Sequence, residues 1–209
     1  TNAMDYVQFL NLAKYKPEQL KLKNKRVAVI GGGATAVDCA ITAKNRGADH
    51  VEIFMLEKYS EMPITTKERE DILNFDIELN SRIRITKIIE TNKQVKGLET
   101  IKVTLPENEK FHPSSVKDTE GTTIRQMGFS AIITSIGMRS GLSRIITDGI
   151  FYAGDISTGP RTVVEATASG KNAALEIDAY LNKKPKPAIN SPTKSYYKLP
   201  GYHPIPIPL

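Results

Sequence analysis

Residues 27–37 read VAVIGGGATAV, and this stretch decides the fold. The branched apolar residues before the glycines predict a buried strand, and the alanine-rich residues after them predict a helix. Gly31, Gly33 and Ala36 match the spacing G-x-G-x-x-G/A. In that pattern the first glycine permits a tight turn, the second leaves room for a pyrophosphate, and the third small residue lets the helix pack on the strand. Because the N–H groups at the start of a helix face an approaching anion, the stretch predicts a dinucleotide phosphate site.

The turn stands inside a strand–helix–strand unit. A helix is predicted over Ala34–Arg46, with Gly47 placed to end it, and a second apolar strand is predicted over Val51–Leu56. Glu57 follows that strand, 24 positions after Gly33, close to the roughly 20 residues expected before a ribose-binding acid. Two plainer interpretations stay open: a glycine turn that binds no ligand, and a Glu57 that is only a solvated loop charge.

The remaining patterns predict a mixed α/β protein. Thr65-x-x-Glu68 is a capping box that opens a helix to about Asn80, although Leu73, Phe75, Ile77 and Leu79 alternate as a strand would. Asp38, early in the helix after the glycines, is expected to make a favourable contact with the helix dipole. The other expected elements are a helix over 4–13, a strand over 82–90, an antiparallel excursion over 94–127, a strand over 131–136, a strand over 149–155, a turn over 157–160, a helix over 162–181 interrupted near Gly170, and an extended proline-rich tail over 185–209.

Composition restricts the class of protein. The chain has 209 residues, 40% hydrophobic and 25% charged, with a net charge of +6, which suits a folded protein of one large domain or two small ones. The lysines are scattered, so no nucleic-acid partner is expected, and no apolar run approaches the roughly 20 residues of a membrane span. Cys39 is the single cysteine, which fits a reducing cytoplasm and a small buried side chain.

Longer stretches resemble a known family. Residues 26–54 (RVAVIGGGATAVDCAITAKNRGADHVEIF), Met62-Pro63, and residues 151–181 (FYAGDISTGPRTVVEATASGKNAALEIDAYL) resemble the small (beta) subunit of glutamate synthase and the flavin/nicotinamide region of dihydropyrimidine dehydrogenase. These are flavoproteins with two dinucleotide-binding domains, in which a nicotinamide-binding domain is inserted into an FAD-binding domain. The resemblance covers roughly residues 4–184.

The resemblance implies a domain organisation. Residues 1–24 are expected to be an N-terminal connector, with Thr1-Asn2-Ala3 a tag remnant, 25–139 the NAD(P)H-binding domain, 140–184 the C-terminal piece of the FAD-binding domain, and 185–209 the tail. The fold expected is Rossmann-like α/β with three layers and an antiparallel β excursion. The first half of the FAD domain and the family's iron–sulfur region are not in this sequence, so we expect the chain to be a fragment.

The resemblance also implies site residues. Relatives that use NADPH carry two basic residues where this chain has Leu56 and Glu57, so NADH is expected to be preferred, with Lys58 as the counterargument. Asp155 would accept hydrogen bonds from the ribityl chain of FAD, or else it is an ordinary turn aspartate. The residues expected to bind NAD(P)H are Gly31, Gly33, Ala34, Thr35, Glu57, Lys58 and Gly137, and those expected to bind FAD are Gly154, Asp155, Thr162 and Val163.

These expectations lead to one function and its competitors. The leading hypothesis is a cytoplasmic NAD(P)H-dependent flavoprotein oxidoreductase that passes electrons to iron–sulfur clusters outside this chain, in other domains or a catalytic large subunit. The fragment alone is expected to be inactive. The alternatives are a module that only binds or senses a nicotinamide dinucleotide and the electron-input part of a dihydropyrimidine-dehydrogenase-like enzyme. A third hypothesis, a simple Rossmann dehydrogenase acting on a small substrate, is disfavoured because the chain carries the Gly154-Asp155 element and the helix after it instead. One cysteine excludes a CxxC dithiol within this chain, and the histidines at 50, 112 and 203 are too dispersed to predict a metal site.

Overall fold

The structure is a computed structural model, which describes residues 2–137, 147–159 and 162–185. The chain divides into two compact units, 1–137 and 138–209. Each is described by itself.

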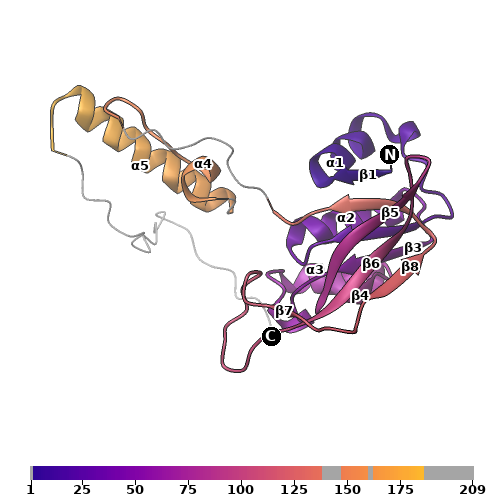
Figure 1. Ribbon diagram of the computed structural model, residues 1–209. Coiled ribbons are helices and arrows are strands. Elements are labelled where there is room, and N and C mark those ends of the chain that lie inside the picture. The colour runs from indigo at the N-terminus through magenta and orange to yellow at the C-terminus, as the bar shows by residue number, and fades with distance from the viewer. Residues whose placement is uncertain (1, 138–146, 160–161, 186–209) are drawn as a thin grey trace, which may run out of the picture. The chain divides into compact units, whose positions relative to one another are not determined.

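Figure 1 shows the course of the chain in the first unit. This unit contains a parallel sheet of five strands in the order β1-β9-β2-β3-β4. All four pairings between neighbouring strands are parallel. Strand β2 is central and pairs on one side with β9 and on the other with β3, so the chain that leaves β2 emerges between two strand ends. The strands are β1 (Ala3–Asp5), β2 (Arg26–Ile30), β3 (His50–Phe54), β4 (Glu78–Asn80) and β9 (Phe129–Thr134).

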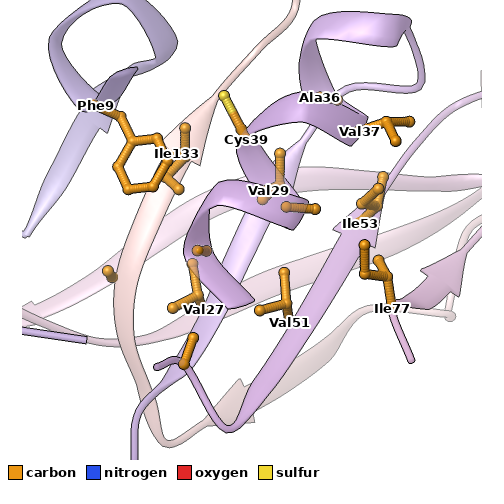
Figure 2. Close-up of a cluster of buried hydrophobic side chains, with 14 of the residues drawn as sticks. Phe9, Val27, Val29, Ala36, Val37, Cys39, Val51, Ile53, Ile77 and Ile133 are labelled. Carbon is orange, nitrogen blue, oxygen red and sulfur yellow. The ribbon is translucent and has the colours of Figure 1, made fainter. Parts of the chain in front are cut away.

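Helices cover one face of this sheet. The helices are α1 (Tyr6–Tyr15), α2 (Ala34–Asn45) and α3 (Thr66–Asn74), with short 3₁₀ turns η1 (Pro17–Gln19) and η2 (Tyr59–Glu61). Figure 2 shows the core beneath them, where Phe9 of α1 and Ala36, Val37 and Cys39 of α2 lie over alternate strand residues. Those strand residues are Val27, Val29, Val51, Ile53 and Ile133. Each such buried side chain contributes roughly 1.5–3 kcal/mol relative to an exposed one.

A twisted antiparallel sheet covers the other face. Strands β5 (Ile83–Thr91), β6 (Gln94–Thr104) and β8 (Ile124–Met127) pair in the order β5-β6-β8, and β7 (Lys117–Asp118) pairs with the end of β6. Its apolar residues, among them Val95 and Leu98, pack on Ala28, Phe54 and Ile132 of the parallel sheet. The unit therefore has three layers, helices over a parallel sheet over an antiparallel sheet, and the predicted Rossmann-like class with a β excursion is confirmed.

Several boundaries differ from the prediction. The capping box at Thr65 and Glu68 is present, but the helix ends at Asn74 instead of Asn80. Asp76 turns the chain in the left-handed region (φ 49°), and 78–80 then pair with β3 as a strand. The edge of a hydrophobic sheet therefore overrides helix propensity there.

The N-terminal segment packs within the first unit. Ala3–Asp5 pair with β9 as strand β1, which includes Ala3 of the predicted tag remnant. Phe9 and Ala13 of α1 are buried in the helix-side core, as are Leu20 and Leu22 after it. The burial of these four apolar side chains explains why the segment is held.

In the second unit, three local predictions are wrong. Residues 149–155 form no strand, because none of the described residues of this unit offers a partner strand, and Asp155–Thr158 form the one-turn helix α4 where a turn was predicted. Helix α5 (Val163–Leu181) runs without a break through Gly170. A glycine in a helix costs only about 1 kcal/mol relative to alanine. The predicted tail lies outside the described residues beyond Pro185.

A buried ion pair joins β2 to β3 and gives the first prediction. Glu52 is 3% exposed, and its carboxylate accepts from Arg26 Nε and from Asn80 Nδ2. Arg26→Met would leave the carboxylate without its cation, so we expect the free energy of unfolding to fall by about 3 kcal/mol. Urea denaturation measures it. The matched control is Lys67→Met, which removes an exposed pair with Asp71 and is expected to cost less than about 0.5 kcal/mol. Equal losses in the two variants would contradict this account.

Candidate functional site

The glycine turn lies where the carboxyl ends of β2 and β9 meet. Gly31 has φ +131°, and its N–H donates to Phe54 O at 2.9 Å. A Cβ on Gly31 would lie 2.1 Å from the carbonyl oxygen of Ser135. No side chain fits there, so Gly31 is required both by its backbone conformation and by the close approach of the β9 end. Ligands of open parallel sheets bind at this kind of position, at the carboxyl ends of adjacent strands.

Gly33 is the N-cap of α2 and faces open space. Its φ of −93° is ordinary, and a Cβ built on it meets no described atom within 4 Å. The N–H groups of Ala34 and Thr35 follow in the first helical turn, where no intrahelical acceptor exists. Bare backbone, unpaired donors and the positive helix end together suit a pyrophosphate. The residues present therefore fit the phosphates of a dinucleotide.

Glu57 reaches back to the same turn. A Cβ on Gly32 would lie 2.6 Å from Glu57 Oε2, so the carboxylate occupies the space that a side chain at Gly32 would need. Glu57 is half-buried and follows β3, the strand beside β2. The structure thus brings together the acid and the glycines that the spacing predicts. Sequence reasoning missed Gly32, although a glycine at a free position of the motif is a signal of a second close approach.

The segment Met55–Glu61, here the Glu57 loop, is held by a neighbouring arginine. Arg82 lies between β4 and β5 and donates from Nη1 to Leu56 O (2.7 Å) and from Nη2 to Glu61 Oε1 (2.8 Å). Glu61 Oε2 accepts from the N–H of Lys58 at 2.8 Å. Neither Arg82 nor Glu61 was singled out from the sequence, because they lie 21 positions apart and only the fold brings them together.

The other predicted residues of this unit contribute less. Lys58 is exposed. Gly137 has φ +85° and follows β9 on the same side as the glycine turn. The expected dipole contact of Asp38 is wrong: no acidic residue lies in the first turn of α2, and burial and the nearby Glu68 raise the pKa of the Asp38 carboxyl. The dipole acts only within the first turn.

The predicted flavin residues lie in the second unit. Gly154 has φ +64°, its N–H donates to Ser169 Oγ at 3.0 Å, and Asp155 begins α4. Thr162 is the N-cap of α5 and forms a capping box with Glu165. Val163 follows and is 82% exposed. The side chains of this cap are used within it, because the N–H of Glu165 donates to Thr162 Oγ1 and the N–H of Thr162 donates to Glu165 Oε2. A carboxylate therefore already lies at the start of α5, where an anionic edge of a flavin would approach.

Two further observations concern other chemistry. Within the described ranges, no three His, Cys, Asp or Glu side chains lie close enough together to hold a metal ion. The same residues contain no helix long and apolar enough to cross a membrane.

Comparison with known proteins decides the family. The model of the pyridine nucleotide-disulphide oxidoreductase family matches residues 3–170. The chain belongs to this family. The beta subunit of the NADP(+)-dependent formate dehydrogenase of Moorella thermoacetica is 31% identical over 182 residues, which are 78% of this chain and 26% of that protein. The small chain of the NADPH glutamate synthase of Bacillus subtilis (strain 168) is 26% identical over 86% of this chain and 45% of its own length.

A solved structure supports the fold. The thioredoxin reductase of T. acidophilum superposes with a TM-score of 0.58 at 18% identity, over 87% of this chain and 58% of that one. The chain described here spans less than half the length of each of the two curated relatives named above.

Gly31 and Gly33 give a matched pair of substitutions. Gly33→Ala places its methyl group in open space, so we expect unfolding free energy to change by less than about 1 kcal/mol while dinucleotide binding weakens. Gly31→Ala cannot be accommodated beside Ser135, so we expect it to destabilise the fold by more than about 2 kcal/mol. Urea denaturation and calorimetric titration with NADH measure the two effects. A Gly33→Ala protein that binds NADH like the parent would contradict the proposed phosphate position.

The buried thiol of Cys39 gives a prediction about its rate of chemical labelling. Its thiol is buried in the helix-side core (Figure 2). Burial, with a smaller contribution from Asp38, raises the pKa of Cys39 to about 12. The thiolate is the reactive form of a cysteine. At pH 8 the labelling rate of the folded protein with a disulfide reagent should therefore be limited by the rate at which the fold opens, whereas the protein unfolded in urea should be labelled much faster. Fast labelling of the folded protein would show that Cys39 is accessible.

Proposed function

We propose that this chain is the nicotinamide-binding part, with a C-terminal piece of the FAD-binding part, of a flavin-dependent NAD(P)H oxidoreductase resembling the glutamate synthase small subunit. The observation that carries the proposal is the glycine turn, where Gly33 faces open space and the carboxylate of Glu57 lies against the neighbouring Gly32. Membership of the pyridine nucleotide-disulphide oxidoreductase family supports it.

In this proposal each group at the turn has one task. The amides of Ala34 and Thr35 and the end of α2 bind the pyrophosphate. Gly31 lets β9 approach, and Gly137 leaves the end of that strand open toward the nicotinamide side. Glu57 accepts hydrogen bonds from the ribose hydroxyls of the adenosine.

We propose NADH as the preferred nucleotide. A carboxylate at the ribose accepts from a 2′-hydroxyl and repels a 2′-phosphate. The two curated relatives described above are named for NADP(+) or NADPH, so this chain would differ from them in nucleotide choice. Lys58 is the one cation of the Glu57 loop and is exposed. If NADPH is the preferred nucleotide instead, Lys58 is the side chain that would bind its 2′-phosphate.

FAD and a partner complete the proposal. When bound, FAD would accept the hydride, and iron–sulfur clusters outside this chain would take its electrons one at a time. Gly154, Asp155, Thr162 and Val163 would hold part of the flavin nucleotide.

The apolar surface of helix α5 supports the proposal that a partner covers this helix. Several of its large apolar residues are exposed, including Val163 (82%), Val164 (77%) and Leu181 (72%). Exposure of this kind marks a surface that another part of a protein covers, here other domains or a large subunit.

A module that binds the dinucleotide without turnover remains the competing function. The same glycine turn supports it, and only turnover of a longer protein with an artificial electron acceptor separates the two.

The test exchanges the charge at Glu57. Glu57→Arg removes the acceptor for the ribose and supplies a cation for a 2′-phosphate, so the ratio of NADPH to NADH affinity should rise by about tenfold or more. Calorimetric titration of the 209-residue chain with each nucleotide measures it. Glu70→Arg makes the same charge change at an exposed position of α3 and should leave the ratio within about twofold. An unchanged ratio in Glu57→Arg would refute the role of Glu57.

A further inference from the structure

Arg82 and Glu61, which form an ion pair, make hydrogen bonds to the backbone on both sides of Glu57. Arg82 reaches the loop through its side chain, which donates to Leu56 O, and through its own N–H, which donates to Glu57 O at 3.4 Å. On the following residue, the N–H of Lys58 donates to Glu61. Backbone groups before, at and after the Glu57 side chain are therefore bound by Arg82 or by the carboxylate that pairs with it.

Burial makes this pair a firm attachment. The side chains of Arg82 and Glu61 are 15% and 25% exposed, and the guanidinium also lies over the ring of Phe111, 5.3 Å from its centre. Both carboxylate oxygens of Glu61 are used, one by Arg82 and one by Lys58 N. A pair that is mostly removed from water and bonded at both ends holds its geometry better than an exposed pair does.

We infer that the Glu61–Arg82 pair is a positioning element for nucleotide selectivity, holding the Glu57 carboxylate against the glycine turn although neither side chain touches the nucleotide. The inference rests on the proposed function, in which Glu57 meets the adenosine ribose. A carboxylate held in place loses little conformational freedom when it accepts the ribose hydroxyls. With its backbone fixed, the carboxylate also has fewer positions in which it avoids a 2′-phosphate, so the same restraint improves NADH binding and worsens NADPH binding.

This role differs measurably from a merely structural one. Loss of a structural ion pair lowers stability and weakens both nucleotides alike. Loss of a positioning pair moves the two affinities in opposite directions. NADH binds more weakly because Glu57 accepts hydrogen bonds from the ribose less well, and NADPH binds more tightly because Glu57 repels the 2′-phosphate less. The readout is therefore the ratio of the two dissociation constants, with thermal unfolding measured beside it.

The experiment uses the full 209-residue chain, three variants that test the ion pair, and Glu57→Gln alone and combined with Arg82→Met. Arg82→Met removes the two side-chain bonds to Leu56 O and Glu61, leaves the backbone N–H of residue 82 in place, and keeps an unbranched side chain at a left-handed position (φ 56°). Glu61→Gln keeps an acceptor for Lys58 N and removes the charge, so it guards against a failure of Arg82→Met to fold. Arg84→Met is the matched control, because Arg84 likewise donates to a backbone carbonyl (Val116 O) and pairs with a carboxylate (Asp118), and neither partner belongs to the Glu57 loop.

We expect the preference for NADH to fall about threefold to tenfold in Arg82→Met, by a smaller factor in Glu61→Gln, and to stay constant in Arg84→Met. Combination with Glu57→Gln closes a double-mutant cycle. If the pair acts through Glu57, Arg82→Met should no longer change the ratio once Glu57 is Gln.

Three results would overturn the inference, and one of them also overturns its basis. If Glu57→Gln changes the ratio of the two dissociation constants and Arg82→Met does not, Glu57 discriminates between NADH and NADPH without help from the Glu61–Arg82 pair. If Arg82→Met has the same effect with Gln at position 57, the pair acts by another route. If Glu57→Gln leaves the ratio unchanged, or if neither nucleotide binds, the proposed role of Glu57 fails and the inference fails with it.

Discussion

The carbonyl group of Ser135 lies where a side chain of Gly31 would be, and the site depends on this contact. It brings the end of β9 against the turn that leaves β2 and forces the chain to rise away from the sheet before α2 begins. The open N-terminus of α2 is the result. Because β2 has β9 on one side and β3 on the other, the same turn also lies next to the segment that follows β3, which carries Glu57.

Two layers of packing keep that geometry fixed. Alternate residues of β2, β3 and β9 face the helices, and the residues between them face the antiparallel sheet. The central strand is therefore buried on both faces, as parallel strands usually are. The glycine turn follows directly from β2, in which Val27, Ala28 and Val29 are all fully buried. A phosphate site on such a support loses little free energy to reorganisation on binding.

The sequence predicted the parts of this unit in which local pattern and fold agree. The glycine spacing, the helix after it, the capping box at Thr65 and the acid at 57 all follow from residues near one another in the chain. The missed features depend on contacts between distant residues. The strand at 78–80 exists because β3 offers an edge, β1 exists because β9 offers one, and Arg82 meets Glu61 only after β4 and β5 have formed. In the second unit, the strand predicted at 149–155 has no described partner, so its apolar pattern alone does not make it a strand.

The most direct test of the central claim follows the backbone amides of the isotopically labelled chain by NMR as NADH is added. The account predicts that the largest shifts belong to Gly33, Ala34 and Thr35, with a second group at Glu57 and Lys58. The alternative location is the groove over the antiparallel sheet that is lined by Lys87, Ile88, Ile89, Glu90, Glu99 and Arg125. Shifts confined to that groove, or no shifts at saturating NADH, would contradict the claim that the glycine turn is a dinucleotide site.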